Sequence, residues 1–168
     1  MSKTWLIADT HWGHQGVCNF LAKDGVSKLR PWDRADDMDA DMVERWNSVV
    51  GEKDRVWVLG DWAINRRCIG IARALKGRLA LVSGNHDIFK TKEYLDVGFD
   101  RVQGSHVLDN ILLTHIPVHP GSKGRFKGNV HGHLHDRSID DDWYTCISVE
   151  HTNFYPVNFE EIRSKYAV

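Results

Sequence analysis

The chain has 168 residues, of which 42% are hydrophobic and 27% are charged, a balance that is ordinary for a globular protein. Its formal net charge of −1 excludes a protein held to nucleic acid mainly by bulk positive charge. The end of a nucleic acid or a small nucleotide is still compatible with this charge, because a single site needs few cations.

The cysteines and the first residues bear on the compartment. Cys18, Cys68 and Cys146 are odd in number and widely spaced, which favours free thiols in a reducing compartment over a disulfide framework. Residues 1–4 lead into an apolar run that is already broken at Asp9, unlike a signal peptide. No apolar run reaches the length of a membrane span. We therefore expect a cytoplasmic protein without a membrane partner, built as a single domain over residues 1–168.

Apolar runs and turn residues predict the elements. In chain order, the first half is expected to contain a strand at 5–8, mostly loop at 10–35 with a short helix near 17–22, a helix at 36–50, a strand at 56–59, a helix at 65–76 and a strand at 79–82. The second half is expected to contain a helix at 91–97, strands at 107–108 and 111–114, a strand at 129–132, a strand at 143–149 and a helix at 158–166.

Local signals support several of these boundaries. Asp36 or Asp37 can cap the helix at 36–50, and Asp109-Asn110 is a plausible two-residue hairpin turn. Asn158 followed by Glu161 is a capping-box pattern. The order of strands and helices predicts an α/β protein, a mixed sheet system with helices outside.

Five of the apolar runs end on side chains that can bind a metal ion or move protons. These are Asp9 and His11, then Asp61, then Asn85, His86 and Asp87, then His115, and finally His133 and His135. The ends of strands are where open α/β sheets keep their ligand sites. Gly84 allows the chain to turn sharply there, so we expect these side chains to gather at one place.

Seven of these residues form a candidate ligand set: Asp9, His11, Asp61, Asn85, His115, His133 and His135. One divalent ion uses about four ligands, so the surplus predicts two ions. Asp61 is the natural bridge, since a carboxylate has two oxygens to share. Mixed Asp, Asn and His ligands suit first-row ions, and we expect two Mn²⁺ ions, with Fe, Zn²⁺ or Ni²⁺ as alternatives.

The motifs together resemble the calcineurin-like metallophosphoesterase superfamily. They are Asp9-Thr10-His11, Gly60-Asp61, Gly84-Asn85-His86-Asp87, His115 and Gly132-His133-Leu134-His135. The resemblance implies a four-layer α/β/β/α sandwich, in which two mixed β-sheets are flanked by helices. It also implies one metal held by Asp9, His11, Asp61 and His135, and a second held by Asp61, Asn85, His115 and His133. After Asp61 the chain reads Trp62-Ala63-Ile64-Asn65, without the further Asp and Arg of the protein Ser/Thr phosphatase branch, which argues against that role.

The resemblance also implies a mechanism, in which a hydroxide that bridges the two ions attacks phosphorus. His86, which the family motif matches, is expected to protonate the leaving group. Asp87 either orients His86 or holds the turn. His14 either touches the substrate or makes a loop hydrogen bond.

We predict a phosphodiesterase that acts on nucleotide diesters such as 2′,3′-cyclic phosphates, with RNA ends as possible substrates. A phosphomonoesterase is the alternative among hydrolases, and a non-catalytic metal-binding scaffold is the alternative outside them. The seven tryptophans are expected chiefly in the core, although Trp12 and Trp62, next to candidate ligands, could instead offer a stacking surface for a base. Arg30, Arg34 and the basic loop at 116–128 either grip a phosphate or are solvated surface. The oligomeric state is not predicted.

Overall fold

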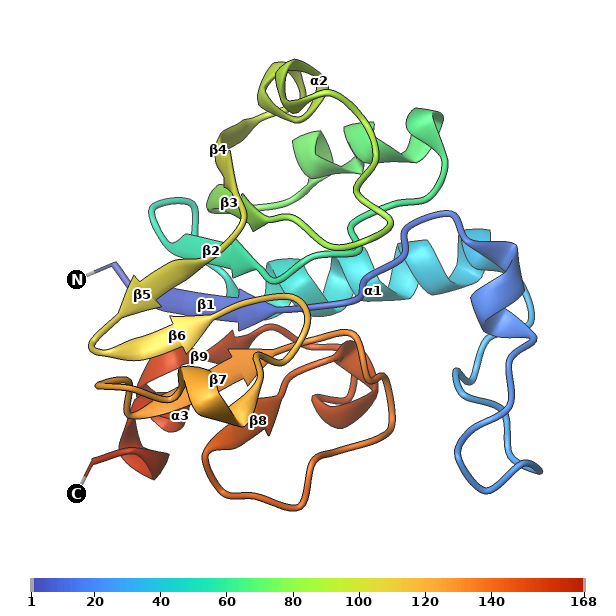
Figure 1. The fold of residues 1–168 in the computed structure, drawn as a ribbon. Coiled ribbons are helices and arrows are strands. Elements are labelled where there is room, and N and C mark those ends of the chain that lie inside the picture. The colour runs from blue at the N-terminus through green and yellow to red at the C-terminus, as the bar shows by residue number, and fades with distance from the viewer. Residues whose placement is uncertain (1, 168) are drawn as a thin grey trace.

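The computed structural model describes residues 2–167 and contains two β-sheets (Figure 1). The first sheet has the strand order β4-β3-β2-β1-β9. These strands are β4 (Phe99–Gln103), β3 (Arg78–Val82), β2 (Arg55–Val58), β1 (Thr4–Ile7) and β9 (Val157–Asn158). Strands β1 to β4 are parallel, and β9 is antiparallel to β1.

The second sheet has the order β5-β6-β7-β8. These strands are β5 (His106–Leu108), β6 (Ile111–Leu113), β7 (Gly128–His131) and β8 (Tyr144–Cys146). Only the β5–β6 pair is antiparallel. Asp109 and Asn110 form its turn with φ of 50° and 63°, the left-handed geometry that two-residue hairpins require.

The helices are short except for one. The α-helices are α1 (Ala35–Val49), α2 (Thr91–Asp96) and α3 (Phe159–Lys165). The 3₁₀ helices are η1 (Gln15–Cys18), η2 (Arg66–Ala74), η3 (Pro120–Ser122) and η4 (Val149–His151). Among residues 2–167, no helix is long and apolar enough to cross a bilayer.

Alternation along the central strands divides the core into two layers. Trp5 and Ile7 of β1 point to one face of the first sheet, where they join the apolar side of α1. Leu6 and Ala8 point to the other face and meet Val130 of the second sheet. The two sheets therefore pack face to face with helices outside, which confirms the expected fold class.

Some local predictions are wrong. The segment at 65–76 is a 3₁₀ helix, because Arg66 and Arg67 oppose the helix dipole at its start and Gly70 weakens its middle. The short helix expected near 17–22 is the 3₁₀ turn η1 at 15–18. No side chain caps α1, whose N-cap is Arg34; the two aspartates instead lie in its first turn.

Candidate metal centre

All seven candidate ligands lie after the C-terminal ends of strands from both sheets. Asp9 and His11 follow β1, Asp61 follows β2, Asn85 follows β3, His115 follows β6, and His133 and His135 follow β7. Backbone hydrogen bonds join the first two loops: the Asp9 N–H donates to Gly60 O at 3.0 Å, and the His11 N–H donates to Asp61 O at 3.0 Å.

Six of these residues form two clusters. One contains Asp9, His11 and His135, and the other contains Asp61, His115 and His133; within each cluster the nearest ligand atoms lie within 4.8 Å of one another. Asp61 connects the clusters, since its Oδ2 is 3.6 Å from His11 Nε2 and 3.4 Å from His115 Nε2. Asn85 Oδ1 lies 3.0 Å from His115 Nε2, so the amide faces the second cluster.

The backbone is strained at this place. Asp9, His11 and Asp61 have φ of 58°, 50° and 54°, and His133 and His135 have φ of 70° and 51°. Non-glycine residues rarely adopt the left-handed region, and such strain persists where the surrounding structure enforces it. Five of the seven candidate ligands therefore share an unfavourable conformation, a pattern typical of functional sites.

Several polar atoms in the first cluster suit a cation. Asp9 Oδ2 accepts hydrogen bonds from Ser148 Oγ at 2.7 Å and from the His133 N–H at 2.8 Å. Asp9 Oδ1 and both ring nitrogens of His11 are buried without a hydrogen-bond partner among residues 2–167. Leaving such atoms unpaired is unfavourable. A carboxylate oxygen and imidazole nitrogens that face one another fit a divalent first-row ion.

The electrostatics are unequal across the centre. Burial raises the pKa of Asp9 to about 6, because the charged form loses hydration. Burial also favours the neutral form of Asp61, but the hydrogen bond and charge of His115 outweigh it and lower the Asp61 pKa to about 2. The His115 pKa rises to about 8, since Asp61 and Asp9 overcome its own desolvation. A cation at the centre would lower the pKa values of both carboxylates.

A buried ion pair that the sequence reading missed supports the first cluster. Glu150 Oε1 lies 3.2 Å from His135 Nδ1 and 2.8 Å from Arg30 Nη2. Arg30 also donates to the backbone oxygens of Asp9 at 2.6 Å and Thr10 at 2.9 Å. Groups that hydrogen-bond to the ring nitrogen that does not bind the metal orient metal-binding imidazoles. No local pattern marks Glu150 or Ser148, which lie 120 and 139 residues from their partners Arg30 and Asp9.

The ion pair with Glu150 rules out both roles predicted for Arg30, which were to grip a phosphate or to lie on the solvated surface. Arg30 is fully buried, so it is neither solvated surface nor free to grip a phosphate. Arg34 is exposed and pairs with Asp36. In the loop at 116–128, Lys123 pairs with Asp141 at 2.7 Å.

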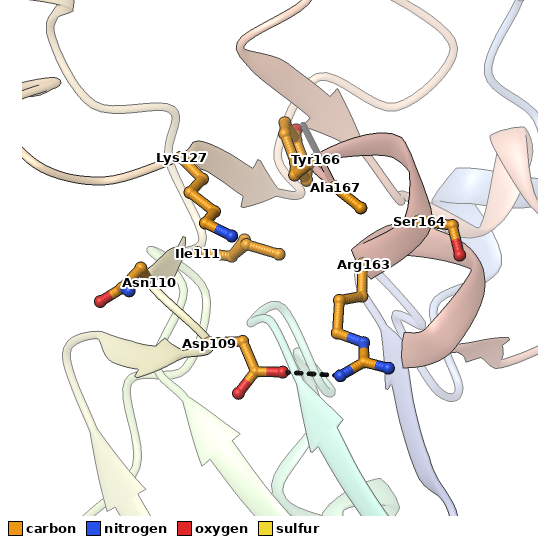
Figure 2. A pocket seen from close by; sticks show the side chains of 8 residues that line it. All are labelled: Asp109, Asn110, Ile111, Lys127, Arg163, Ser164, Tyr166 and Ala167. Carbon is orange, nitrogen blue, oxygen red and sulfur yellow. Dashed lines mark ion pairs between the residues drawn. The ribbon is translucent and has the colours of Figure 1, made fainter.

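Lys127, another cationic residue of that loop, lines a separate pocket of about 400 Å³ (Figure 2). Asp109 and Arg163 form an ion pair at 3.5 Å in the same pocket. It lies at the starts of β6 and β7, whereas the candidate ligands follow the ends of those strands.

The three predicted catalytic residues differ in their surroundings. His86 is exposed, with its ring centroid 5.6 Å from that of His11. The Asp87 carboxylate accepts hydrogen bonds from the N–H groups of Asp61, Trp62 and Gly84 at 2.8, 2.9 and 2.8 Å. Asp87 therefore holds the turn, the second of its two predicted roles. His14 is half-buried, and its ring centroid lies 5.7 Å from that of His11.

The prediction that Trp12 and Trp62 offer a stacking surface is wrong. Trp12 and Trp62 have no exposed surface, because their rings pack edge to face at 5.6 Å in the core beneath the first sheet.

Two grooves instead leave the centre at the surface. One, of about 530 Å³, is lined by Phe20, Leu21, Leu29, His133, Leu134, His135, Asp136 and Arg137. The other, of about 480 Å³, is lined by residues around Asn85 and His115, including Ser83, Ser105 and Ile116. The two grooves share no residue.

Known proteins resemble this chain over most of its length. No protein-family model matches it. An uncharacterized protein of Methanocaldococcus jannaschii is 28% identical over 177 residues, which cover 96% of this chain and 90% of the relative. The crystal structure of a protein of unknown function from Aquifex aeolicus is 26% identical, with a TM-score of 0.67, over 98% of this chain and 99% of that one.

Two solved structures with named activities share the fold at lower identity. A Pseudomonas putida nuclease MPE has a TM-score of 0.52 and 20% identity over 79% of this chain and 61% of its own. An archaeal phosphodiesterase has a TM-score of 0.53 and 18% identity over 87% of this chain and 83% of its own. The present chain shares the fold of these two proteins, and this is the arrangement of two mixed β-sheets flanked by helices that the sequence motifs led us to expect.

Proposed function

We propose that this chain is a metal-dependent phosphodiesterase that uses two divalent ions. The observation that carries the proposal is the pairing of two ligand clusters through one carboxylate, since Asp61 Oδ2 lies within 3.6 Å of a histidine from each cluster. A pair of divalent ions in such a site, when bound, polarises phosphate oxygens and activates water at neutral pH.

The ligands divide as the clusters do. Asp9, His11 and His135 would hold one ion, His115, His133 and Asn85 would hold the other, and Asp61, which lies near a histidine of each cluster, would serve both. Hydrogen bonds orient two of these ligands. The Ser148 hydroxyl donates to Asp9 Oδ2, which leaves Oδ1 for a metal. The Leu59 carbonyl accepts from His115 Nδ1 at 2.9 Å, which leaves Nε2 for a metal. The mixed ligand set favours Mn²⁺, with Fe, Zn²⁺ and Ni²⁺ as alternatives.

His86 supplies the proton in this proposal. Hydrolysis adds the oxygen of water to phosphorus and breaks one phosphorus–oxygen ester bond. The oxygen that leaves takes a proton from the protonated His86 ring, and the proton that the attacking water loses reprotonates this ring, so that no net proton is taken up. An exposed ring close to His11 is free to reach a leaving group at the mouth of the centre.

The two grooves favour a diester over a monoester. A monoester carries one organic substituent on its phosphate. A diester carries two, and both need room to extend away from the metal centre. Separate grooves beside His133 and beside Asn85 offer room for both. A 2′,3′-cyclic nucleotide is the natural candidate, because its strained ester has a good leaving group and needs little recognition beyond the ions.

The test compares two substrates with the same chromophore. Protein loaded with Mn²⁺ is assayed on bis-p-nitrophenyl phosphate and on p-nitrophenyl phosphate, with Asp61→Asn as the control for contaminating activity. Faster diester hydrolysis that Asp61→Asn abolishes supports the proposal. Faster monoester hydrolysis would make the protein a phosphomonoesterase, and no hydrolysis with any of the four metals would make it a scaffold.

A further inference from the structure

One small hairpin beside the candidate centre exposes apolar side chains. The segment at 20–29 closes through hydrogen bonds from the Leu29 N–H to Phe20 O and from the Ala22 N–H to Ser27 O, both at 2.8 Å. Phe20 and Leu21 remain 49% and 56% exposed, while Leu29 packs against the core. In Figure 1 this hairpin projects from the body of the molecule in blue.

Two sets of contacts, at Lys23 and at Arg30, attach this hairpin to the segments that carry the candidate ligands. The Lys23 N–H donates to the carboxylate of Asp136, which lies directly after His135. Arg30, the residue after Leu29, is anchored beneath the centre through Glu150 and the backbone of Asp9. The exposed side chains are therefore held at a set distance from the ligand clusters.

The groove between the hairpin and residues 133–137 adjoins both clusters. His133 and His135 line it, and they belong to different clusters. A group bound in this groove of about 530 Å³ would therefore lie directly beside residues of both clusters. The remaining walls are apolar apart from Asp136 and Arg137.

We propose that this groove binds the base of a nucleotide phosphodiester, with the Phe20 ring as its stacking platform. The inference rests on the proposed function and names the part of the substrate that the metals do not recognise. A flat heteroaromatic base matches an aromatic wall, and its polar edge matches charged residues at the rim. Phe20 is the only aromatic ring among the exposed large hydrophobic residues in the described range 2–167.

The rings of Phe20 and His14 pack edge to face, with centroids 5.9 Å apart and an interplanar angle of 84°. His14 in turn neighbours His11. This contact holds the Phe20 ring on one side, while the residue stays 49% exposed. It also gives His14 a role, which is to position the stacking ring.

The experiment compares Phe20→Ala and Phe20→Trp with the control Val107→Ala, a 45% exposed residue on β5. Each protein is loaded with Mn²⁺ and assayed on adenosine 2′,3′-cyclic phosphate and on ribose 2′,3′-cyclic phosphate, which has no base. Loss of one stacking contact should raise KM of Phe20→Ala for the nucleotide about 10-fold with kcat near wild type. KM for the sugar phosphate should not change, and Phe20→Trp should retain nucleotide KM.

A second readout separates this inference from the proposed function. Adenosine monophosphate is titrated into the same Mn²⁺-loaded proteins, and Phe20→Ala should bind it about 10-fold more weakly than Val107→Ala. Equal losses on both cyclic phosphates, or unchanged nucleotide binding by Phe20→Ala, would overturn the inference. Failure of the wild type to hydrolyse any diester would overturn the proposed function, while the titration still decides whether the groove holds a base.

Discussion

Glu150 and Arg30 form a buried ion pair beneath the first ligand cluster, with Oε1 and Nη2 2.8 Å apart and side chains 3% and 0% exposed. The charge of Arg30 holds the Glu150 pKa at about 2, although burial alone would raise it. The carboxylate is therefore ionised, and its contact with His135 Nδ1 leaves Nε2 of that ring as the nitrogen available to a metal.

We expect Glu150→Gln to weaken metal binding about 10–100-fold at the cluster of Asp9, because the imidazole of His135 loses its charged partner. The other cluster should change little, since a backbone carbonyl orients His115. A Mn²⁺ titration of chelator-treated protein resolves the binding of the first ion from the binding of the second.

The matched control is Glu52→Gln, an exposed position, and Glu150→Asp should recover part of the loss. Equal weakening of both binding events, with circular dichroism showing an intact fold, would contradict the positioning role of Glu150.

Metal content is the second prediction. Elemental analysis after Mn²⁺ loading should approach two ions per chain. Removing them with a chelator should lower Tm, because an ion at 100 times its Kd stabilises the folded state by about 2.7 kcal/mol. Asp61→Asn should weaken both binding events, whereas His135→Ala should weaken one. Saturation at a single ion would refute the shared-carboxylate interpretation.

His86→Ala should lower kcat for bis-p-nitrophenyl phosphate by roughly 100-fold or more, as expected for loss of a general acid. Because the side chain is exposed, the fold and both metal sites should remain. His119→Ala is the matched control: this histidine is also exposed and accepts a hydrogen bond from the Gly121 N–H. Full activity of His86→Ala would transfer the role to another group, with His14 the next candidate.

The fourth prediction concerns acid stability and a residue far from the clusters. Asp54 accepts hydrogen bonds from the Lys3 N–H at 2.8 Å, the Trp5 Nε1–H at 2.9 Å and the Gly51 N–H at 2.9 Å. Burial favours the neutral form, but these bonds outweigh it and hold the Asp54 pKa below its usual 3.8. A lowered folded-state pKa gives stability that is present above the unfolded value and lost as pH falls through the folded one.

Wild-type protein should accordingly lose unfolding free energy on acidification below about pH 4. Asp54→Asn should be less stable by about 1 kcal/mol at neutral pH, and the difference should shrink toward low pH. Denaturant titrations at several pH values measure both effects, with exposed Asp142→Asn as the control. If the stability difference between wild type and Asp54→Asn grew on acidification, the folded-state pKa of Asp54 would have to be raised and not lowered.

Several elements could be predicted because their signals are local. The hairpin at Asp109-Asn110 and the apolar stripe of α1 depend on neighbours in sequence, and both form as expected. Strands β4 and β9 were not predicted. β9 has only two residues, and β4 reads Phe-Asp-Arg-Val-Gln, which is neither a continuous apolar run nor a clean alternation. They become strands through pairing with β1 and β3, which no local pattern contains.

The sequence by itself determined which candidate ligands gather at the centre, because these residues follow strands whose apolar runs are read residue by residue. His11, Asp61 and His115 are predicted to converge from their places at strand ends, and they do. Only the tertiary structure decided what surrounds them. Burial of Arg30 beside Glu150, and of Trp12 beside Trp62, depends on contacts across 120 and 50 residues of chain. Composition and spacing cannot report such contacts, since exposure is fixed by packing between distant segments.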